Sequence, residues 1–363
     1  MRSLHATAVV CGCLALLGGA ASVSQPPTFK EFTRRFGKQY GVQDFIQREK
    51  VYEENLKVIA SLNREGKGQF WAEVNQFADW TPEEIKARRL ARRAHPEFAG
   101  RLAHPAPSTP SQGTVGSCWA FSTVENIEGQ WALAGHGLTP LSAEYLVVRA
   151  LFEGARNAAL RHTPNAAPDT QDCDDRDCSV FGGWPYRAYG FIESVGGVPS
   201  AASHPYCAGT GACYPCMLNP NTTFCGPPPT YCNHTRSKLV CASHTPAATI
   251  SGWHRIDANE TAMKLALAQQ GPLSVLMDAS GLEWYGGGVW NPTGFLACSS
   301  QCDALDHAVL LVGYGTDAAS GLPYWLVKNS WGAAWGEAGY FRLARGFNRC
   351  AIDCQVTTAV VPT

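Results

Sequence analysis

Cys118 is the residue of this chain whose surroundings most favour a chemical role. It ends the segment Gln112-Gly-Thr-Val-Gly-Ser-Cys118, in which a glycine-rich turn delivers the thiol to the start of a predicted helix. The positive end of a helix dipole favours a thiolate, which is the nucleophilic form of cysteine. Such a residue can attack a carbonyl carbon and form a thioester acyl-enzyme. By residue type alone Cys118 would more often be a disulfide partner, and the local sequence reverses that expectation.

Three further residues could complete the chemistry of acyl transfer. His307 would hold the thiolate as an ion pair and then protonate the leaving amine. Asn329 would accept a hydrogen bond from the other ring nitrogen and fix the orientation of the imidazole. The Gln112 amide and the Cys118 backbone N–H would form an oxyanion hole. One such donor typically stabilises the transition state by about 3 kcal/mol.

The elements that must position these residues can be read from the apolar pattern. Ala120, Val124, Ile127 and Trp131 share one face of a helix predicted over 117–134, which Gly135 or Gly137 can end. Strands are predicted at 273–277, 307–314, 324–329 and 339–343. His307 begins one of these strands and Asn329 ends another.

Ahead of Gln112 the chain changes character twice. Residues 27–95 contain no cysteine and have apolar residues at helical spacing. Residues 96–111 are rich in proline, alanine, histidine and serine, which is typical of a linker open to proteolytic nicking. Six residues at intervals of 4, 4, 3, 4 and 4 fall on one side of the predicted helix, namely Asp44, Arg48, Tyr52, Asn55, Ile59 and Asn63.

The ordered segments resemble those of the papain-like cysteine peptidases, the cathepsin family. The resemblance is carried by the Cys118 segment, Gly182-Gly183-Trp-Pro185, Leu305-Asp-His-Ala-Val309, and Tyr324-Trp-Leu-Val-Lys-Asn-Ser-Trp-Gly332 followed by Trp335-Gly-Glu337. It covers most of residues 112–357. It implies an α+β, two-lobed papain-like fold at 112–363, with a helical left lobe and a β-barrel-like right lobe, and a reaction that needs no cofactor and no metal.

The same resemblance implies a substrate site. Gly182 and Gly183 would let an extended peptide pair with the enzyme backbone, because no side chain blocks its approach. An apolar pocket for the second residue before the scissile bond would favour Leu, Val or Phe. Gln355 at its base could admit a larger or basic side chain, although this residue could equally face solvent. The remaining residues expected in the substrate site are Trp184, Pro185, Leu276, Leu305, Asp306, Ala308 and Trp331.

Residues 27–95 resemble the family's inhibitory prosegment in its cathepsin L-like form, which makes the chain's own prosegment an intramolecular inhibitor. Asp44 stands where the family usually has Glu, and Tyr52 where it has Phe or Trp. Asn75, Phe77 and Asp79 match a second prosegment motif; a generic pair of helices is the alternative. Carboxylates lose charge near pH 4, so acid should loosen the block.

Several features predict export. Residues 1–22 have the pattern of a signal peptide. Of the 15 cysteines, Cys11 and Cys13 lie in that peptide, and twelve of the other thirteen could form disulfides. Sequons begin at Asn221, Asn233 and Asn259. We therefore expect the protein to pass through the secretory pathway to a lysosome or the extracellular space. There we expect it to be a monomer that acts on proteins and peptides and has no membrane partner. The net charge of −1 argues against nucleic acid as a partner.

The sequence also departs from the family. Val115 and Val180 occupy the positions of a disulfide beside the active site and are predicted to touch. The stretch before Gln112 is short, and two insertions, 149–171 and 207–241, lengthen the gap between Cys118 and His307. An endopeptidase is favoured; the alternatives are an exopeptidase whose cleft is restricted by 207–241 and an inactive homologue acting as a binding protein.

Acidic and cysteine-containing segments leave further alternatives. The acidic run 172–177 could hold calcium but more often would be a solvated loop. Cysteine pairing is predicted between Cys350 and either Cys298 or Cys302, and between Cys173 and either Cys207 or Cys213.

Overall fold

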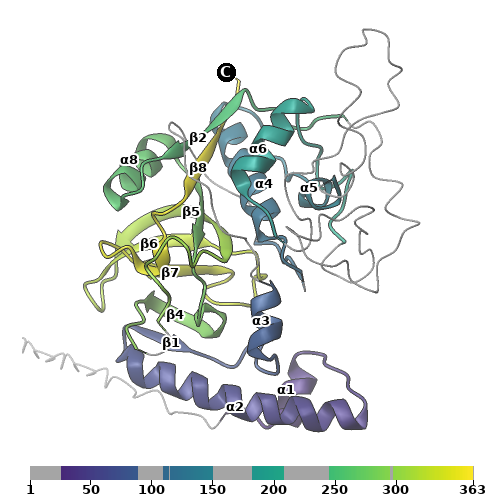
Figure 1. Ribbon diagram of the computed structural model, residues 1–363, viewed down its shortest axis with the longest axis vertical. Coiled ribbons are helices and arrows are strands. Elements are labelled where there is room, and N and C mark those ends of the chain that lie inside the picture. Colours follow the sequence, from purple (N-terminus) through teal and green to yellow (C-terminus); the bar gives the residue numbers. More distant parts are fainter. Residues whose placement is uncertain are drawn as a thin grey trace, which may run out of the picture. The chain divides into compact units, whose positions relative to one another are not determined.

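The computed structural model describes residues 26–88, 109–113, 115–149, 182–207, 245–294 and 297–362 (Figure 1). The chain divides into two compact units, 1–39 and 40–363. The first contains helix α1 (Phe29–Arg35), which begins with a reciprocal capping box between Thr28 and Glu31. Within the described residues, no helix has the length and apolar character needed to cross a membrane.

The second unit begins with the elements of the predicted prosegment: α2 (Val42–Gly66), β1 (Phe70–Ala72) and α3 (Pro82–Arg88). The predicted helical face is present on α2. Asn55 is buried, and its amide donates hydrogen bonds to the carbonyls of Ala78 (3.0 Å) and Trp80 (2.9 Å). Tyr52 and Ile59 are buried beside it, whereas Asp44 lies exposed in the first turn.

A helical part follows, formed by α4 (Cys118–Leu133), α5 (Ala143–Arg149) and α6 (Pro185–Ser194). The boundaries of α4 lie within one residue of the predicted 117–134. Every α4 residue from Cys118 to Gln130 is buried, because the helix contacts α5 and α6 as well as β3, β5 and β8. Because α4 is buried on all sides, its first residue, Cys118, is held in a fixed position.

The strand-rich part begins at Gly252. The described strands form one sheet in the order β1-β4-β7-β6-β5-β3-β8-β2, antiparallel except for the parallel pair β4 and β7. The four predicted strands are present with boundaries shifted by at most two residues, and β1, β2, β4 and β8 are additional. The bounds are β2 (Gly252–Ile256), β3 (Leu273–Met277), β4 (Tyr285–Trp290), β5 (His307–Thr316), β6 (Pro323–Lys328), β7 (Tyr340–Ala344) and β8 (Val356–Val360), with α8 (Glu260–Gln270) between β2 and β3.

The predicted barrel-like closure of this sheet is wrong, because the sheet is open. Among the described strands its edges are β1, which pairs with β4, and β2, which pairs with β8. The β4 edge is occupied by the prosegment strand, and β2 is covered by contacts with α6 and α8. β1 itself contacts α2, so helices lie against the edge strands at both ends of the sheet.

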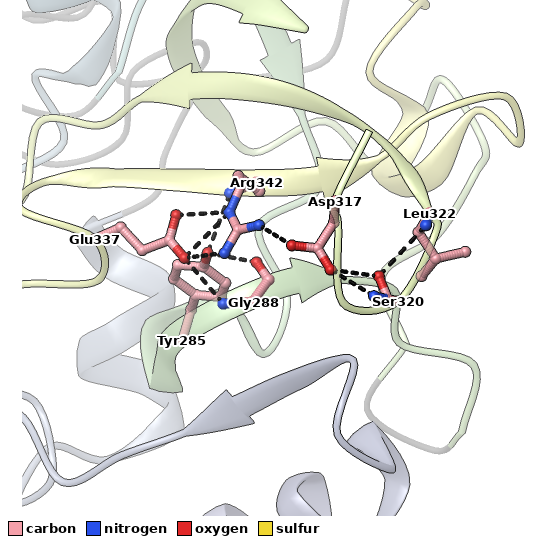
Figure 2. A network of polar contacts seen from close by, with 7 residues as sticks. All are labelled: Tyr285, Gly288, Asp317, Ser320, Leu322, Glu337 and Arg342. Carbon is pink, nitrogen blue, oxygen red and sulfur yellow. Dashed lines mark hydrogen bonds and ion pairs between the residues drawn. The ribbon is translucent and has the colours of Figure 1, made fainter. Parts of the chain in front are cut away.

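A polar network ties β4, β7 and the β5–β6 turn together (Figure 2). Arg342 on β7 forms ion pairs of 2.6 Å with Asp317 in the turn and with Glu337. Glu337 also accepts the Gly288 N–H (3.0 Å), and Tyr285 donates to the Gly288 carbonyl (2.7 Å). The network gives a glycine-rich strand a fixed position that its own side chains could not provide.

Two disulfides join the segments 298–302 and 350–354. Cys298 pairs with Cys350, which confirms one of the two predicted alternatives, and Cys302 pairs with Cys354. Cys207 is also disulfide-bonded. Its predicted partner Cys173, and Cys213, the alternative partner predicted for Cys173, lie outside the described residues.

Candidate active site

Cys118 is the first residue of α4, and its side chain is completely buried. It is the free cysteine among the described cysteines. Burial raises the pKa of its thiol to about 12, although hydrogen bonds, the largest from the Ala308 backbone N–H, act in the opposite direction. Burial therefore acts against the thiolate that the helix terminus favours. The Ala308 contact places the sulfur beside the residue that follows His307.

His307 begins β5 and is also fully buried. Its Nε2 donates to the Asn329 Oδ1 at 2.8 Å. Asn329 follows β6, and the β5–β6 pairing brings the two together across 22 positions of sequence. The Trp331 ring stacks on the imidazole with centroids 4.9 Å apart. Because Nε2 is engaged, Nδ1 is the ring nitrogen that can exchange a proton in a reaction.

Gln112 is buried and bound to the segment that carries Asn329. Its backbone N–H donates to the Ser330 carbonyl (2.7 Å), and its Oε1 accepts from the Ser330 hydroxyl (2.6 Å). Its Nε2 donates to the Val115 carbonyl (2.8 Å). Gln112 is thus held between the residue after Asn329 and the turn before Cys118, and one of its amide hydrogens is used in that turn.

The strand register brings several residues of the predicted substrate site close together. Leu276 on β3 lies opposite Ala308 on β5, and its N–H donates to the Gln355 carbonyl (3.0 Å). The Gln355 side chain is buried rather than solvent-facing, at 6% exposure, and its Oε1 has no hydrogen-bond partner among the described residues. One hydrophobic cluster contains Cys118 together with Trp184, Leu276, Leu305 and Ala308.

The other predicted substrate residues lie close in the chain to these. Gly182 has a left-handed φ of 113°, which favours glycine there, and Gly183 next to it is buried. Pro185 is the first residue of α6 and follows the N-cap Trp184. Asp306 is half-buried, and its carboxylate accepts the Ala279 N–H at 2.8 Å. This bond joins the residue before His307 to the segment that follows β3.

The prosegment covers the His307 side of this site. The Phe77 ring packs edge-on against Trp331, with centroids 5.6 Å apart, and Gln76 donates to the Trp331 carbonyl (3.0 Å). Asn75, in the same predicted motif, donates to the Glu283 carbonyl (2.7 Å). The second prosegment motif therefore contacts the residue that shields the imidazole.

Two further contacts hold the prosegment on the strand-rich part. The β1 strand pairs with β4, where the Trp71 side chain lies over Gly287 so closely that a Cβ there would meet it at 2.2 Å. Glu65 at the end of α2 accepts the backbone N–H groups of Thr293 (2.5 Å) and Gly294 (2.6 Å). The three glycines of β4, Gly286 to Gly288, have no side chains, which allows this close strand-to-strand approach.

Sequence reasoning missed two residues that support the site. Ser330, whose hydroxyl holds Gln112, lies within the recognised Asn329 segment and could have been found from that position. Tyr206 donates to the Gln112 carbonyl (2.8 Å) and shares a hydrogen bond with the Ser117 hydroxyl (2.6 Å). No local pattern marks Tyr206, because it adjoins an insertion. Val180 lies outside the described residues, so the structure does not describe its predicted contact with Val115. The acidic run 172–177 also lies outside them, as do the two insertions apart from residues 149 and 207.

Comparisons with known proteins identify the family. Residues 103–360 match the papain family cysteine protease domain, and residues 29–85 match the cathepsin propeptide inhibitor domain. Cysteine proteinase 1 of Dictyostelium discoideum is 31% identical and covers 92% of each chain. Cathepsin F of Drosophila melanogaster is 32% identical over 92% of this chain. The chain spans about half the length of that relative.

The fold comparison includes a precursor. A digestive procathepsin L 3 from the larval midgut of Tenebrio molitor superimposes with a TM-score of 0.65 and 26% identity, covering 92% of this chain and 98% of that one. This confirms the predicted papain-like fold preceded by a helical prodomain. Because the protease domain match alone covers well over half of the chain, the protein belongs to the papain family of cysteine proteases.

Proposed function

We propose that the protein is a cysteine endopeptidase made as a zymogen, with Cys118 as its nucleophile and His307 as its acid and base. The observation that carries the proposal is the hydrogen bond from His307 to Asn329, beside a buried cysteine that takes part in no disulfide. An orienting group behind the base is the arrangement that nucleophilic catalysis requires.

The reaction follows from these positions. His307 Nδ1 takes the thiol proton, and the Cys118 sulfur attacks the peptide carbonyl to form a tetrahedral intermediate. Collapse forms the thioester and breaks the C–N bond, while the imidazolium gives its proton to the leaving amine. Water then hydrolyses the thioester with His307 again acting as base. Asn329 and Trp331 keep the ring oriented and shielded throughout.

The oxyanion is assigned to the Cys118 backbone N–H and the Gln112 amide. Gln112 is fixed between Ser330 and Val115, so it can present a donor without reorganisation of the backbone. In the precursor the thiol is buried and its pKa is raised, so we expect it to be neutral and unreactive at neutral pH until the prosegment leaves. We therefore expect the precursor to be inactive for two reasons: the prosegment blocks the site, and the thiol is protonated.

A thiol-directed epoxysuccinyl peptide tests the proposal. The reagent should modify Cys118 stoichiometrically after incubation of the precursor at acidic pH, and much more slowly before it, because burial raises the thiol pKa. Mass spectrometry of the labelled peptide identifies the site. An inactive homologue would remain unlabelled after the prosegment has been removed, and that result would contradict the proposal.

Gln355 is proposed to set preference at the second residue before the scissile bond. Its buried Oε1 has no hydrogen-bond partner among the described residues, and its backbone carbonyl accepts the N–H of Leu276, which belongs to the apolar cluster around Cys118. A substrate side chain with a terminal donor could satisfy this acceptor, and a hydrogen bond to a charged donor is worth about 1.5–3 kcal/mol.

Gln355→Ala should therefore lower kcat/KM for a peptide with Arg at that position by about tenfold relative to the matching Leu peptide. The measurement is the ratio of the two kcat/KM values in wild type and variant. Gln270→Ala is a matched control, since Gln270 on α8 also has a buried Oε1 without a partner among the described residues. An unchanged Arg-to-Leu ratio in Gln355→Ala would contradict the assignment.

The proposed biology is that of an exported enzyme. We propose that residues 1–22 direct export, that cleavage in 96–111 releases the peptidase domain 112–363, and that the mature protein is a lysosomal or secreted monomer acting on proteins and peptides. Residues 109–112 at the end of that linker already hydrogen-bond the 330–332 segment, which favours cleavage upstream of them. Asn259, the described sequon, is exposed at the N-cap of α8 and compatible with glycosylation.

A further inference from the structure

A cavity of about 180 Å³ borders the helix that begins with Cys118. Four residues of α4 at helical spacing form one wall, and the loop before α5 and the segment 201–206 form the others. This volume exceeds the roughly 150 Å³ that suffices to hold a benzene ring in an engineered protein cavity. The lining residues are Pro110, Phe121, Val124, Glu125, Glu128, Pro140, Leu141, Ser142, Ala143, Ala201, His204 and Tyr206.

Two of these lining residues are deeply buried acids. Glu125 is 3% exposed and Glu128 is 5% exposed. Glu125 Oε1 lies 2.9 Å from Lys328 Nζ, and both side chains of that pair are almost wholly buried. Glu128 Oε1 accepts the Leu141 N–H at 2.8 Å, and its other oxygen has no hydrogen-bond partner among the described residues.

The charges in this cluster do not balance when both acids are ionised. Lys328 compensates Glu125 and leaves the charge of Glu128 without a matching cation among the described side chains it contacts. Burial, followed by repulsion from Glu125, raises the pKa of Glu128 to about 8, and burial raises that of Glu125 to about 7. The other titratable groups that face the cavity are His204 and Tyr206 from the opposite segment, and Glu144 lies on the adjoining helix α5.

We propose that this cavity binds a small organic cation, an alkylammonium or guanidinium group, with the free oxygen of Glu128 as its partner. The apolar walls contributed by Phe121, Val124 and Leu141 would hold the carbon chain. The cation would supply the charge that the cluster lacks, and a buried charge-assisted hydrogen bond is about twice as strong as a neutral one.

A ligand at this place would contact the support of the catalytic segment. Tyr206 lines the cavity, its ring packs edge-on against Phe121 at 4.7 Å, and its hydroxyl bonds Ser117 and Gln112. The site is distinct from the proposed substrate pocket, which is built from β3, β5 and residue 355.

The pH dependence of binding follows from the raised pKa of Glu128. Such an acid stabilises the folded protein below its unfolded pKa near 4.5, and that stability is lost as the pH rises through about 8. A cation that pairs with the ionised form restores the lost stability. Its stabilising effect should therefore be larger at pH 8 than at pH 5.

The test measures thermal unfolding of the full-length precursor carrying Cys118→Ala, which cannot process itself, with n-butylammonium as the probe. We expect a rise of about 3 °C in Tm at pH 8 and a smaller rise at pH 5. Glu128→Gln keeps the acceptor for Leu141 but removes the charge, and should abolish the rise. Ala201→Leu, which narrows the cavity, should abolish it while retaining both acids.

Two matched comparisons separate pairing with the Glu128 carboxylate from a general effect of the amine or of its carbon chain. Glu193→Gln removes an exposed carboxylate from α6 and should respond to n-butylammonium as the parent does. The neutral analogue n-butanol should not reproduce the rise at pH 8. No rise in the parent, an equal rise in Glu128→Gln, or an equal rise with n-butanol would each overturn the proposal.

Discussion

Replacing Cys118 by serine is expected to lower kcat/KM for peptide hydrolysis by at least about 10⁴-fold. The hydroxyl is a far weaker nucleophile than a thiolate, and His307 cannot hold it as an ion pair. The precursor should also stop processing itself at acidic pH. Both effects can be followed by fluorogenic peptide hydrolysis and by the electrophoretic size of the purified chain.

A control on the same helix separates loss of chemistry from loss of structure. Thr123→Ala removes a hydroxyl that bonds only the helix's own Trp119 carbonyl (2.7 Å) among the bonds described, and should leave activity close to wild type. Cys118→Ser changes one buried atom, so its Tm should match the parent. Retained activity in Cys118→Ser, with labelling elsewhere, would end the assignment of the nucleophile.

Truncating Phe77 to alanine is expected to release the prosegment and raise the hydrolytic activity of unprocessed precursor by at least about tenfold. Phe77 is 4% exposed and packs edge-on against both Trp331 and Trp80. An aromatic pair contributes about 0.5–1.5 kcal/mol beyond the area that it buries, and loss of the ring also leaves a cavity. The two aromatic pairs alone correspond to about one to two factors of ten in the closed-to-open ratio, and the cavity adds to this.

The matched control is Ile46→Ala, which removes an apolar side chain that is 64% exposed on α2 of the same prosegment. Precursor activity at neutral pH and the rate of conversion at acidic pH should be unchanged in this variant. Tm measurements on both variants show whether the chain remains folded. Equal activities of Phe77→Ala and Ile46→Ala precursors would show that the Trp331 contact does not close the site.

Some elements of this protein are determined by local sequence and could therefore be predicted from it. The helix from Cys118 and the strand from His307 were predicted within two residues, because their apolar patterns persist over several turns or alternations. The pairing of Cys350 was narrowed to two partners, and Cys298 proved to be the right one. The glycine-rich strand β4 was missed, since its position depends on the Arg342 network and on β1 rather than on strand-forming side chains.

By itself the sequence determined which residues carry reactive groups and in what order they occur, because nucleophile, base and orienting amide each lie in a short segment of distinctive composition. Only the tertiary structure decided their environment. Burial raised the pKa of the Cys118 thiol, the Gln355 side chain proved to be buried, and Phe77 met Trp331 across more than 250 positions. The cavity beside Glu128 likewise arises from four separate segments of the chain, at 110, 121–128, 140–143 and 201–206. Desolvation and long-range contact depend on which segments pack together, and no local pattern of residue types encodes that.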